Sequence, residues 1–301
     1  MIVWLAISAM LQATPPTVAA PARPDSVPLS PVAFKAVKAV LDYDRTIPLD
    51  VRLIEVTEFP GHSRHRIVYQ GWRGRLPAYL VLPKTGQAPF PVVLLVHVGS
   101  SSKETWWQAD GAEVGVAMRD SLLNAGFAIF AIDTQGHGER VAVHDFMPVS
   151  TAFAGRRWIN RVRDLGVETA VDLRRGLDYL ETRPEIDVGR ASIVGTSMGG
   201  VVATLVAATD DRIRSAVIGV AAVEHRQLYP FRPLDLAPGL LRPATLILGG
   251  RSDEMIPLRS TERFAAAVGG PRSQLTILDS GHGLPAEYIG HSMRWLRIHG
   301  R

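Results

Sequence analysis

The stretch that decides the fold is Gly195-Thr196-Ser197-Met198-Gly199-Gly200. It follows the strand-like run Ala-Ser-Ile-Val at 191–194 and precedes small apolar residues at 201–208, which predicts a tight turn from a strand into a helix. The glycines suit such a turn because side chains two positions either side of the serine would collide with neighbouring backbone. The pattern is typical of a nucleophile elbow carrying Ser197, and an ordinary strand-to-helix turn is the alternative reading.

Beyond this turn, short apolar strands alternate with helix-length segments, as in a parallel sheet buried on both faces. The expected strands are 92–96, 127–132, 191–194, 216–220, 244–248 and 275–278, and the expected helices are 112–124, 165–182, 198–208, 258–268 and 285–298. Earlier, alternating residues at 66–69 and 78–82 predict antiparallel edge strands. We therefore predict an α/β fold with a mostly parallel central sheet flanked by helices.

A serine hydroxyl is a useful nucleophile only when a base takes its proton, and a histidine base needs an acid to fix its tautomer. In open parallel sheets such groups gather at the carboxyl ends of later strands. Asp253 follows the strand at 244–248, and His282 lies in a glycine-flanked loop after the strand at 275–278. The sequence thus predicts Ser197 as nucleophile, His282 as base and Asp253 as the acid.

Two other carboxylates are rivals for the acid. Glu254 is adjacent to Asp253, and Asp279 lies in the same loop as His282. Asp253 is preferred because of its position after the strand. Histidines elsewhere are interpreted as surface or packing residues, and the pair His62 and His65 has no evident further ligand, so no metal site is predicted.

An oxyanion that develops during acyl transfer must meet preset N–H donors. The backbone N–H of Met198, directly after the nucleophile, is predicted as the first. The second is expected from the loop after the strand at 92–96, where we predict the N–H of Gly99, with Val98 and Ser100 as alternatives.

Residues from about 66 to 298 resemble an α/β-hydrolase of the dienelactone hydrolase, acetyl xylan esterase and prolyl-oligopeptidase catalytic-domain type. The stretches that carry the resemblance are Pro91-Val92-Val93-Leu94-Leu95-Val96-His97, Ala131-Ile132-Asp133-Thr134-Gln135-Gly136-His137-Gly138-Glu139, Asp187-Val188-Gly189-Arg190, Gly195-Thr196-Ser197-Met198-Gly199-Gly200, Gly250-Arg251-Ser252-Asp253 and Gly281-His282-Gly283. The resemblance implies the α/β-hydrolase fold with a small cap at most, the Ser, acid, His order, and no cofactor.

Two positions depart from that family pattern. Val98 stands where the usual oxyanion loop has His-Gly, and Ser197 stands where true dienelactone hydrolases carry cysteine. The second departure argues against a dienelactone as the substrate.

Two long connections are expected to border a substrate pocket. The segment 140–164 contains Trp158 and is expected to form pocket wall or a small cap, and the connection 221–243 contains Tyr229 and is expected to form a modest cap. Trp106, after the oxyanion loop, is a further candidate for the pocket, with core packing as its alternative.

The N-terminus has the order of a secretory signal. Residues 1–22 contain an apolar run followed by prolines and small residues, too short and Pro-interrupted to span a membrane, although no Lys or Arg precedes the run. We expect a signal peptide at 1–22, a linker and N-terminal helix at 23–50, and the hydrolase domain at 51–301. Export to the periplasm or medium is thus predicted, with a cytoplasmic protein as the alternative, and no stable membrane anchor is expected.

Composition narrows the partners. The chain has no cysteine, which excludes disulfides, a thiol nucleophile and thiolate metal sites. Its net charge of +4 comes mostly from scattered arginines that form no cluster, so no nucleic-acid partner is predicted. Nothing in the sequence indicates an oligomeric state.

Together these features predict a serine carboxylesterase that acts on a small-molecule ester through an acyl-enzyme, with deacetylation of small or sugar esters among its reactions. A serine peptidase or amidase of prolyl-oligopeptidase type is the first alternative, although the chain lacks room for the large propeller of those enzymes. A non-catalytic binding protein on the same fold is the second.

Overall fold

The computed structural model describes residues 27–99, 101–108, 113–141 and 159–301. The expected signal peptide at 1–22, the start of the linker, Ser100 and Trp158 lie outside the described residues.

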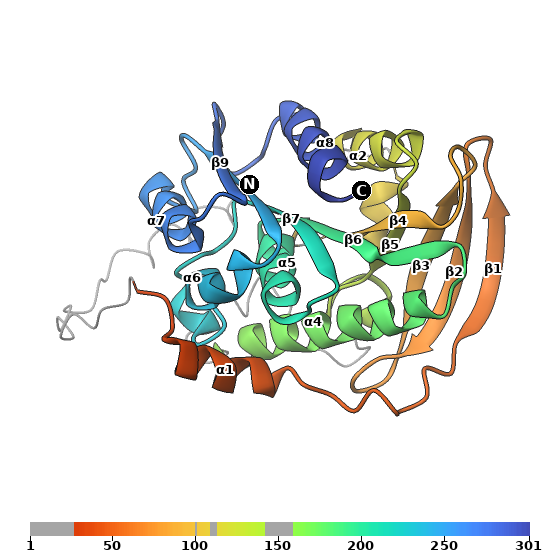
Figure 1. Cartoon of the computed structure of the whole chain (residues 1–301), viewed down its shortest axis with the longest axis horizontal. Coiled ribbons are helices and arrows are strands. Elements are labelled where there is room, and N and C mark those ends of the chain that lie inside the picture. The colour runs from red at the N-terminus through yellow and green to blue at the C-terminus, as the bar shows by residue number, and fades with distance from the viewer. Residues whose placement is uncertain (1–26, 100, 109–112, 142–158) are drawn as a thin grey trace, which may run out of the picture.

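The described chain forms one nine-stranded sheet between two layers of helices (Figure 1). The strands are β1 (Arg52–Glu58), β2 (His62–Gln70), β3 (Arg75–Pro83), β4 (Phe90–Val96), β5 (Ala128–Ile132), β6 (Ile186–Thr196), β7 (Ile213–Gly219), β8 (Ala244–Gly250) and β9 (Ser273–Leu278). Their spatial order is β1-β2-β3-β5-β4-β6-β7-β8-β9. Strands β1, β2 and β3 pair antiparallel with one another, and β3 pairs antiparallel with β5. The other pairs, among β4 to β9, are all parallel, which confirms the predicted α/β class.

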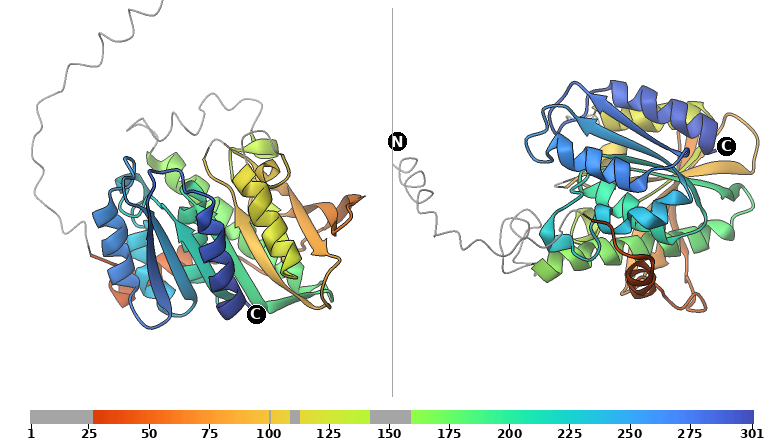
Figure 2. Two further views of the ribbon diagram at one scale, coloured as in Figure 1. Left: turned by 90° about the horizontal axis from the view of Figure 1, so that it is seen from above. Right: turned by 60° about the vertical axis from the view of Figure 1, so that its left-hand side comes forward.

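The helices are α1 (Pro31–Val40), α2 (Glu113–Asn124), α4 (Ile159–Glu181), α5 (Met198–Thr209), α6 (Pro233–Leu236), α7 (Leu258–Val268) and α8 (Glu287–His299). Short 3-10 turns occur at η1 (Lys103–Trp106), η2 (Gly138–Arg140), η4 (Arg226–Leu228) and η5 (Ala237–Leu241). Helices α2 and α8 lie side by side on one face of the sheet, and α1, α4, α5 and α7 pack on the other (Figure 2).

Burial of the central strands on both faces explains the sequence pattern. Every residue of β4, β5 and β8 is buried, so these strands are continuous apolar runs instead of alternating ones. Helix α4 begins at Ile159, six residues before the predicted start at 165, because Val162 continues its apolar stripe. This additional turn and a half of helix borders the candidate active site.

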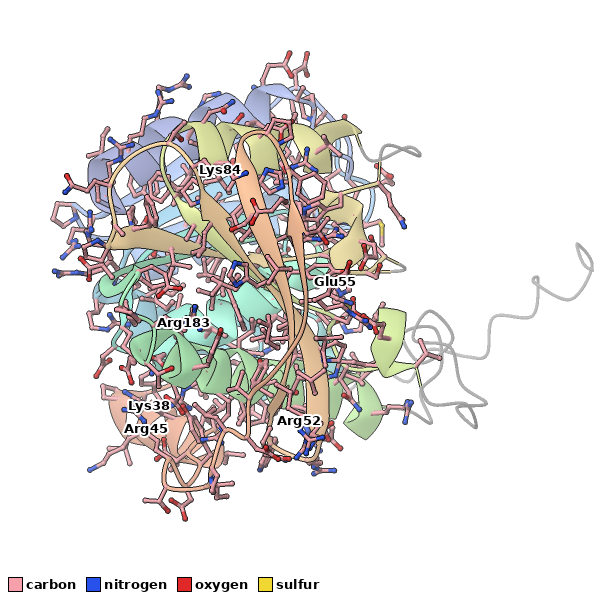
Figure 3. The ribbon with its side chains drawn as sticks, turned by 90° about the vertical axis from the view of Figure 1, so that its right-hand side faces the viewer. Lys38, Arg45, Arg52, Glu55, Lys84 and Arg183 are labelled. Atoms are coloured by element: carbon pink, nitrogen blue, oxygen red, sulfur yellow. The ribbon has the colours of Figure 1, made fainter. Side chains whose placement is uncertain are left out.

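Strand β1 is the free edge of the sheet. Leu53, Ile54 and Val56 are all exposed, and the charged Arg52 and Glu55 lie along the same strand (Figure 3). Leu53 pairs with Ile67 of β2 and Glu55 with Arg66, so Ile54 is an extra residue that forms a β-bulge.

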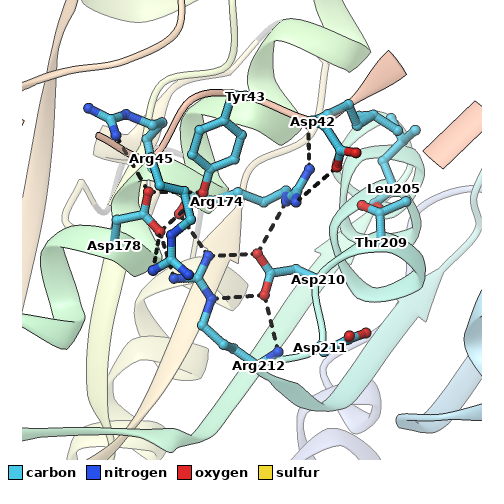
Figure 4. Close-up of polar contacts among 12 residues, drawn as sticks. Asp42, Tyr43, Arg45, Arg174, Asp178, Leu205, Thr209, Asp210, Asp211 and Arg212 are labelled. Atoms are coloured by element: carbon cyan, nitrogen blue, oxygen red, sulfur yellow. Dashed lines mark hydrogen bonds and ion pairs between the residues drawn. The ribbon is translucent and has the colours of Figure 1, made fainter. Parts of the chain in front are cut away.

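The segment after α1 is fixed to the body by a polar cluster, drawn in Figure 4. Tyr43 donates its hydroxyl hydrogen bond to the carboxylate of Asp178 on α4 at 2.9 Å. Arg45 pairs with the same carboxylate at 3.1 Å, and Arg212 donates to it at 2.7 Å while also binding Asp210. Burial and the neighbouring Asp178 raise the pKa of Tyr43 to about 12, so its hydroxyl remains a donor.

Among the described residues, no helix is long and apolar enough to cross a membrane.

Candidate active site

Ser197 lies in a strained turn between β6 and α5. Its backbone has φ 54° and ψ −122°, a conformation that non-glycine residues rarely adopt. The turn is held by the Ser197 N–H, which donates to Gly219 O on β7 at 2.8 Å. A Cβ added at Gly195 would lie 2.1 Å from the carbonyl oxygen of Gly199, and one at Gly199 would lie 2.4 Å from Val96 O. Both glycines are therefore required by close backbone packing.

The three predicted side chains form one hydrogen-bonded chain. Ser197 Oγ lies 2.8 Å from Nε2 of His282, and Nδ1 of His282 lies 3.0 Å from Oδ2 of Asp253. Because an ionised carboxylate only accepts, Nδ1 carries the imidazole proton and Nε2 accepts from the serine hydroxyl. The side chain of Asp253 is 1% exposed, and its Oδ1 accepts from the backbone N–H groups of Met255 and Ile256, both at 2.9 Å. These bonds fix the carboxylate that orients the imidazole.

The rival carboxylates lie elsewhere. The side chain of Asp279 is 95% exposed and faces Arg251 at 3.8 Å. Glu254 lies near the backbone of Gly281, and the carboxylate that contacts His282 is that of Asp253.

Met198 and Gly99 lie next to each other beside Ser197. Met198 is the first residue of α5, where the backbone N–H has no intrahelical acceptor. A Cβ built on Gly99 would lie 3.9 Å from Cβ of Met198, and both residues line the cavity that contains Ser197. The two predicted donors are thus brought together; Ser100 lies outside the described residues.

The oxyanion loop is anchored by a buried histidine that the sequence analysis did not single out. His97 Nδ1 donates to Val98 O at 2.8 Å, and His97 Nε2 accepts from the N–H of Thr134 at 3.0 Å. Burial lowers the pKa of His97 to about 4, so the ring is neutral and can accept at Nε2. The ring therefore ties the loop after β4 to the loop after β5.

A second anchor lies directly after this loop. The fully buried Lys103 donates from Nζ to Asp133 at 2.8 Å and to Glu139 at 2.5 Å, and its backbone N–H donates to Asp133 at 2.7 Å. Burial alone would lower the pKa of Lys103, but these bonds outweigh it and raise the pKa. Gly138, with φ 52°, leaves space for the Asp133 carboxylate. The partners of Lys103 are 30 and 36 residues distant, so no local pattern reveals this cluster.

Ser197 opens into a cavity of about 580 Å³. Its wall comes from the start of α4, the first turns of α5, and the loops after β5, β7 and β8: Thr134, Gln135, Val162, Leu165, Gly166, Thr169, Val201, Val202, Ala222, His225, Leu228, Met255 and Ile256. None of these was predicted individually as a pocket residue, but Val162 lies in the segment 140–164 and Ala222, His225 and Leu228 lie in 221–243, the two segments expected to border the pocket. The apolar periodicity at the start of α4 was the available signal.

Two of the three aromatic residues predicted for the pocket, Trp106 and Tyr229, are not among the residues that line the cavity. Trp106 is buried in the core beside α2, where Gly115 packs against its ring, and it is not among the residues that line the cavity. Tyr229 follows η4, is about half exposed, and stacks with the guanidinium of Arg232. Trp158 lies outside the described residues.

His137 and His62 have structural surroundings. His137 Nδ1 contacts Thr134 Oγ1 at 2.9 Å, and His62 stacks on Phe59. In the part of the chain that the structure describes, His, Asp and Glu side chains form no group of three that could hold a metal ion.

Comparison with known proteins identifies the class. A model of the alpha/beta hydrolase family matches residues 93–244, about half of the chain, and the chain belongs to this family. It is 30% identical over 165 residues to the protein named "Putative hydrolase YtaP" of Bacillus subtilis, a match covering 54% of this chain and 53% of that one. It is 26% identical over 219 residues to the "Putative carboxymethylenebutenolidase" of Escherichia coli K12, covering 71% and 74% of the two chains. The first match thus spans only about half of its relative.

Solved structures share the fold. Acetyl xylan esterase 1 from Thermoanaerobacterium sp. JW/SL YS485 superposes with a TM-score of 0.68 at 18% identity, covering 89% of this chain and 94% of that one. The acetyl xylan esterase from Paenibacillus sp. R4 gives 0.67 at 20% identity, covering 91% and 96%. A cold-adapted esterase from an Arctic intertidal metagenomic library gives 0.66 at 20% identity, covering 82% and 99%.

Proposed function

We propose that the chain is a serine carboxylesterase that cleaves small-molecule esters through an acyl-enzyme. The observation that carries the proposal is the hydrogen-bonded chain from Ser197 through His282 to Asp253, beside two backbone N–H groups. The family membership and the esterases among the structural neighbours support a hydrolytic reaction.

The geometry suits acyl transfer in two steps, acylation of Ser197 and then its deacylation by water. Ser197 Oγ attacks the ester carbonyl while His282 Nε2 takes its proton, and Asp253 stabilises the imidazolium that forms. The N–H groups of Met198 and Gly99 would receive the developing oxyanion. His282 then protonates the leaving alcohol, and a water molecule activated by the same imidazole releases the acid from Ser197.

The test is labelling and turnover of three proteins: wild type, Ser197→Ala and a control, Ser273→Ala. Ser273 begins β9 at its amino end, whereas His282 follows the carboxyl end of the same strand. A fluorophosphonate probe should label the wild type and the control, and Ser197→Ala should remain unlabelled and lose at least about 10³-fold in kcat on p-nitrophenyl acetate. Equal labelling of wild type and Ser197→Ala overturns the proposal.

The leaving group is tested with the same enzyme. A carboxylesterase should hydrolyse p-nitrophenyl esters and acetylated sugars in preference to aminoacyl amides. A preference for the amides would instead support the peptidase or amidase alternative.

A further inference from the structure

The cavity beside Ser197 has an apolar wall. Val201 and Val202 lie three and four residues after Met198, so they continue the face of α5 that begins beside the nucleophile. Opposite them the start of α4 contributes Val162 and Leu165.

The hydroxyl groups of this wall already have partners. Thr169 Oγ1 donates to Leu165 O at 2.7 Å and accepts from the N–H of Gln135 at 3.0 Å, and Thr134 Oγ1 contacts His137 at 2.9 Å. Because these hydroxyls already form hydrogen bonds with protein atoms, they have little hydrogen-bonding capacity left for the hydroxyl groups of a sugar. Apolar groups, in contrast, gain about 0.8 kcal/mol for each methylene removed from water, equivalent to about fourfold in an equilibrium or rate constant.

The volume of the cavity also favours an apolar group larger than a methyl. A volume of about 580 Å³ lies in the range of pockets that enclose a whole small molecule. An acetyl group would present a single methyl to it and leave most of the apolar wall without contact.

We infer that the ester carries a bulky apolar group, aliphatic or aromatic, that packs between α4 and α5 next to Ser197. This inference rests on the proposed esterase function and specifies its substrate class: apolar esters, in preference to short acetyl esters of sugars.

Gly166 sets the space available on the α4 side. It lines the cavity, and a Cβ added there would lie 3.5 Å from Leu205, an ordinary contact distance. Replacement is sterically allowed and favourable for a helix interior. We expect Gly166→Leu to narrow the cavity on this side, and urea unfolding of the variant checks that it remains folded.

The experiment measures kcat/KM along two series of substrates. One series lengthens the acid of p-nitrophenyl esters from acetate to octanoate, and the other lengthens the alcohol of acetate esters from ethyl to octyl. We expect kcat/KM of the wild type to rise about fourfold per methylene in one series, over the first few methylenes. Gly166→Leu should remove at least tenfold of that gain.

The matched control is Gly290→Leu. Gly290 lies on the exposed side of α8, in the other helical layer, and an added Cβ there meets only the side chain of Arg294. This variant should show the chain-length profile of the wild type.

Binding gives a readout independent of catalysis. Calorimetric titration of Ser197→Ala with octanoate should show binding that acetate does not, and Gly166→Leu in the same background should weaken it at least tenfold. If neither ester series shows a chain-length gain, or Gly166→Leu matches Gly290→Leu in both series and in octanoate binding, the inference is overturned. If octanoate binds as expected but Ser197→Ala keeps full esterase activity, only the proposed catalytic function fails.

Discussion

At the scale of single residues, the elbow shows how much of the site depends on the absence of side chains. Ser197 adopts φ 54°, and it can do so because Gly195 and Gly199 allow strand, turn and helix to approach closely. The strain is localised at the residue that would perform the chemistry.

This packing leads to a first prediction, for Gly195→Ala. The added Cβ would lie 2.1 Å from Gly199 O and 2.4 Å from Gly199 C, both backbone atoms that cannot rotate away. The turn must shift, and a displacement of about 1 Å typically costs about 10²-fold in rate. We expect kcat on p-nitrophenyl esters to fall at least about 10²-fold and the unfolding free energy in urea to fall by about 1–3 kcal/mol.

Gly283→Ala is the matched control, because it lies next to His282 but an added Cβ meets no atom within 4 Å. Its unfolding free energy should stay within about 0.5 kcal/mol of the wild type. If the two alanine variants behaved alike, the close contact at Gly195 would not be limiting.

The three side chains that form the hydrogen-bonded chain could be picked out because each has a local signature. Ser197 lies between glycines after an apolar run, and Asp253 and His282 follow the ends of two later apolar runs. Trp106 and Tyr229 were placed in the pocket because they are aromatic and lie after or within segments expected to border it. Whether such a side chain faces a cavity, the core or solvent depends on contacts between distant elements, and no local pattern encodes them.

At the scale of helices and strands, local patterns could again be predicted from the sequence, whereas contacts between distant segments could not. The parallel strands were predicted closely because burial on both faces gives unbroken apolar runs. The docking of the segment after α1 could not be predicted, since Tyr43 and its acceptor Asp178 are 135 residues apart.

That docking gives a second prediction, for Asp178→Ala. The side chain of Asp178 is 7% exposed and serves Tyr43, Arg45 and Arg212. Removing it leaves the Tyr43 hydroxyl without its acceptor and takes one of two buried carboxylates from Arg212, which keeps Asp210, so the expected cost is about 1–3 kcal/mol. Urea unfolding should show this loss, and limited proteolysis should cleave near Arg45 faster than in the wild type.

Glu181→Ala serves as its control, because Glu181 also binds Arg45 but its side chain is 38% exposed. Exposed ion pairs contribute at most about 1 kcal/mol, so this variant should unfold close to the wild type. Equal losses in both variants would contradict a special role for the buried carboxylate.

At the scale of the whole molecule, buried neutral histidines make stability depend on pH. Burial lowers the pKa of His97 to about 4, whereas an exposed histidine in the unfolded chain titrates near 6.5. Between these values the unfolded state binds more protons, so stability is complete above about pH 6.5 and is lost as pH falls toward 4. Burial also lowers the pKa of His62, His137 and His225, which acts in the same direction.

The third prediction tests the contribution of His97 separately from those of the other buried histidines. His97→Gln should be less stable than the wild type at pH 7, because the bonds to Val98 and Thr134 are disturbed. That difference in unfolding free energy should shrink by about 3 kcal/mol between pH 7 and pH 4, since the variant has no proton to bind at this position. Urea unfolding at several pH values measures it. A difference that stays constant with pH would mean that His97 is already protonated in the folded protein or titrates normally.

The extra residue in β1 has a consequence for how the molecules behave together at high concentration. A free strand edge with exposed Leu53, Ile54 and Val56 is a template on which a strand of another chain could add. The bulge at Ile54 breaks the regular spacing of that edge, and Arg52 and Glu55 place charges along it. We therefore expect this irregularity, one residue long, to hinder edge-to-edge joining of sheets from separate molecules.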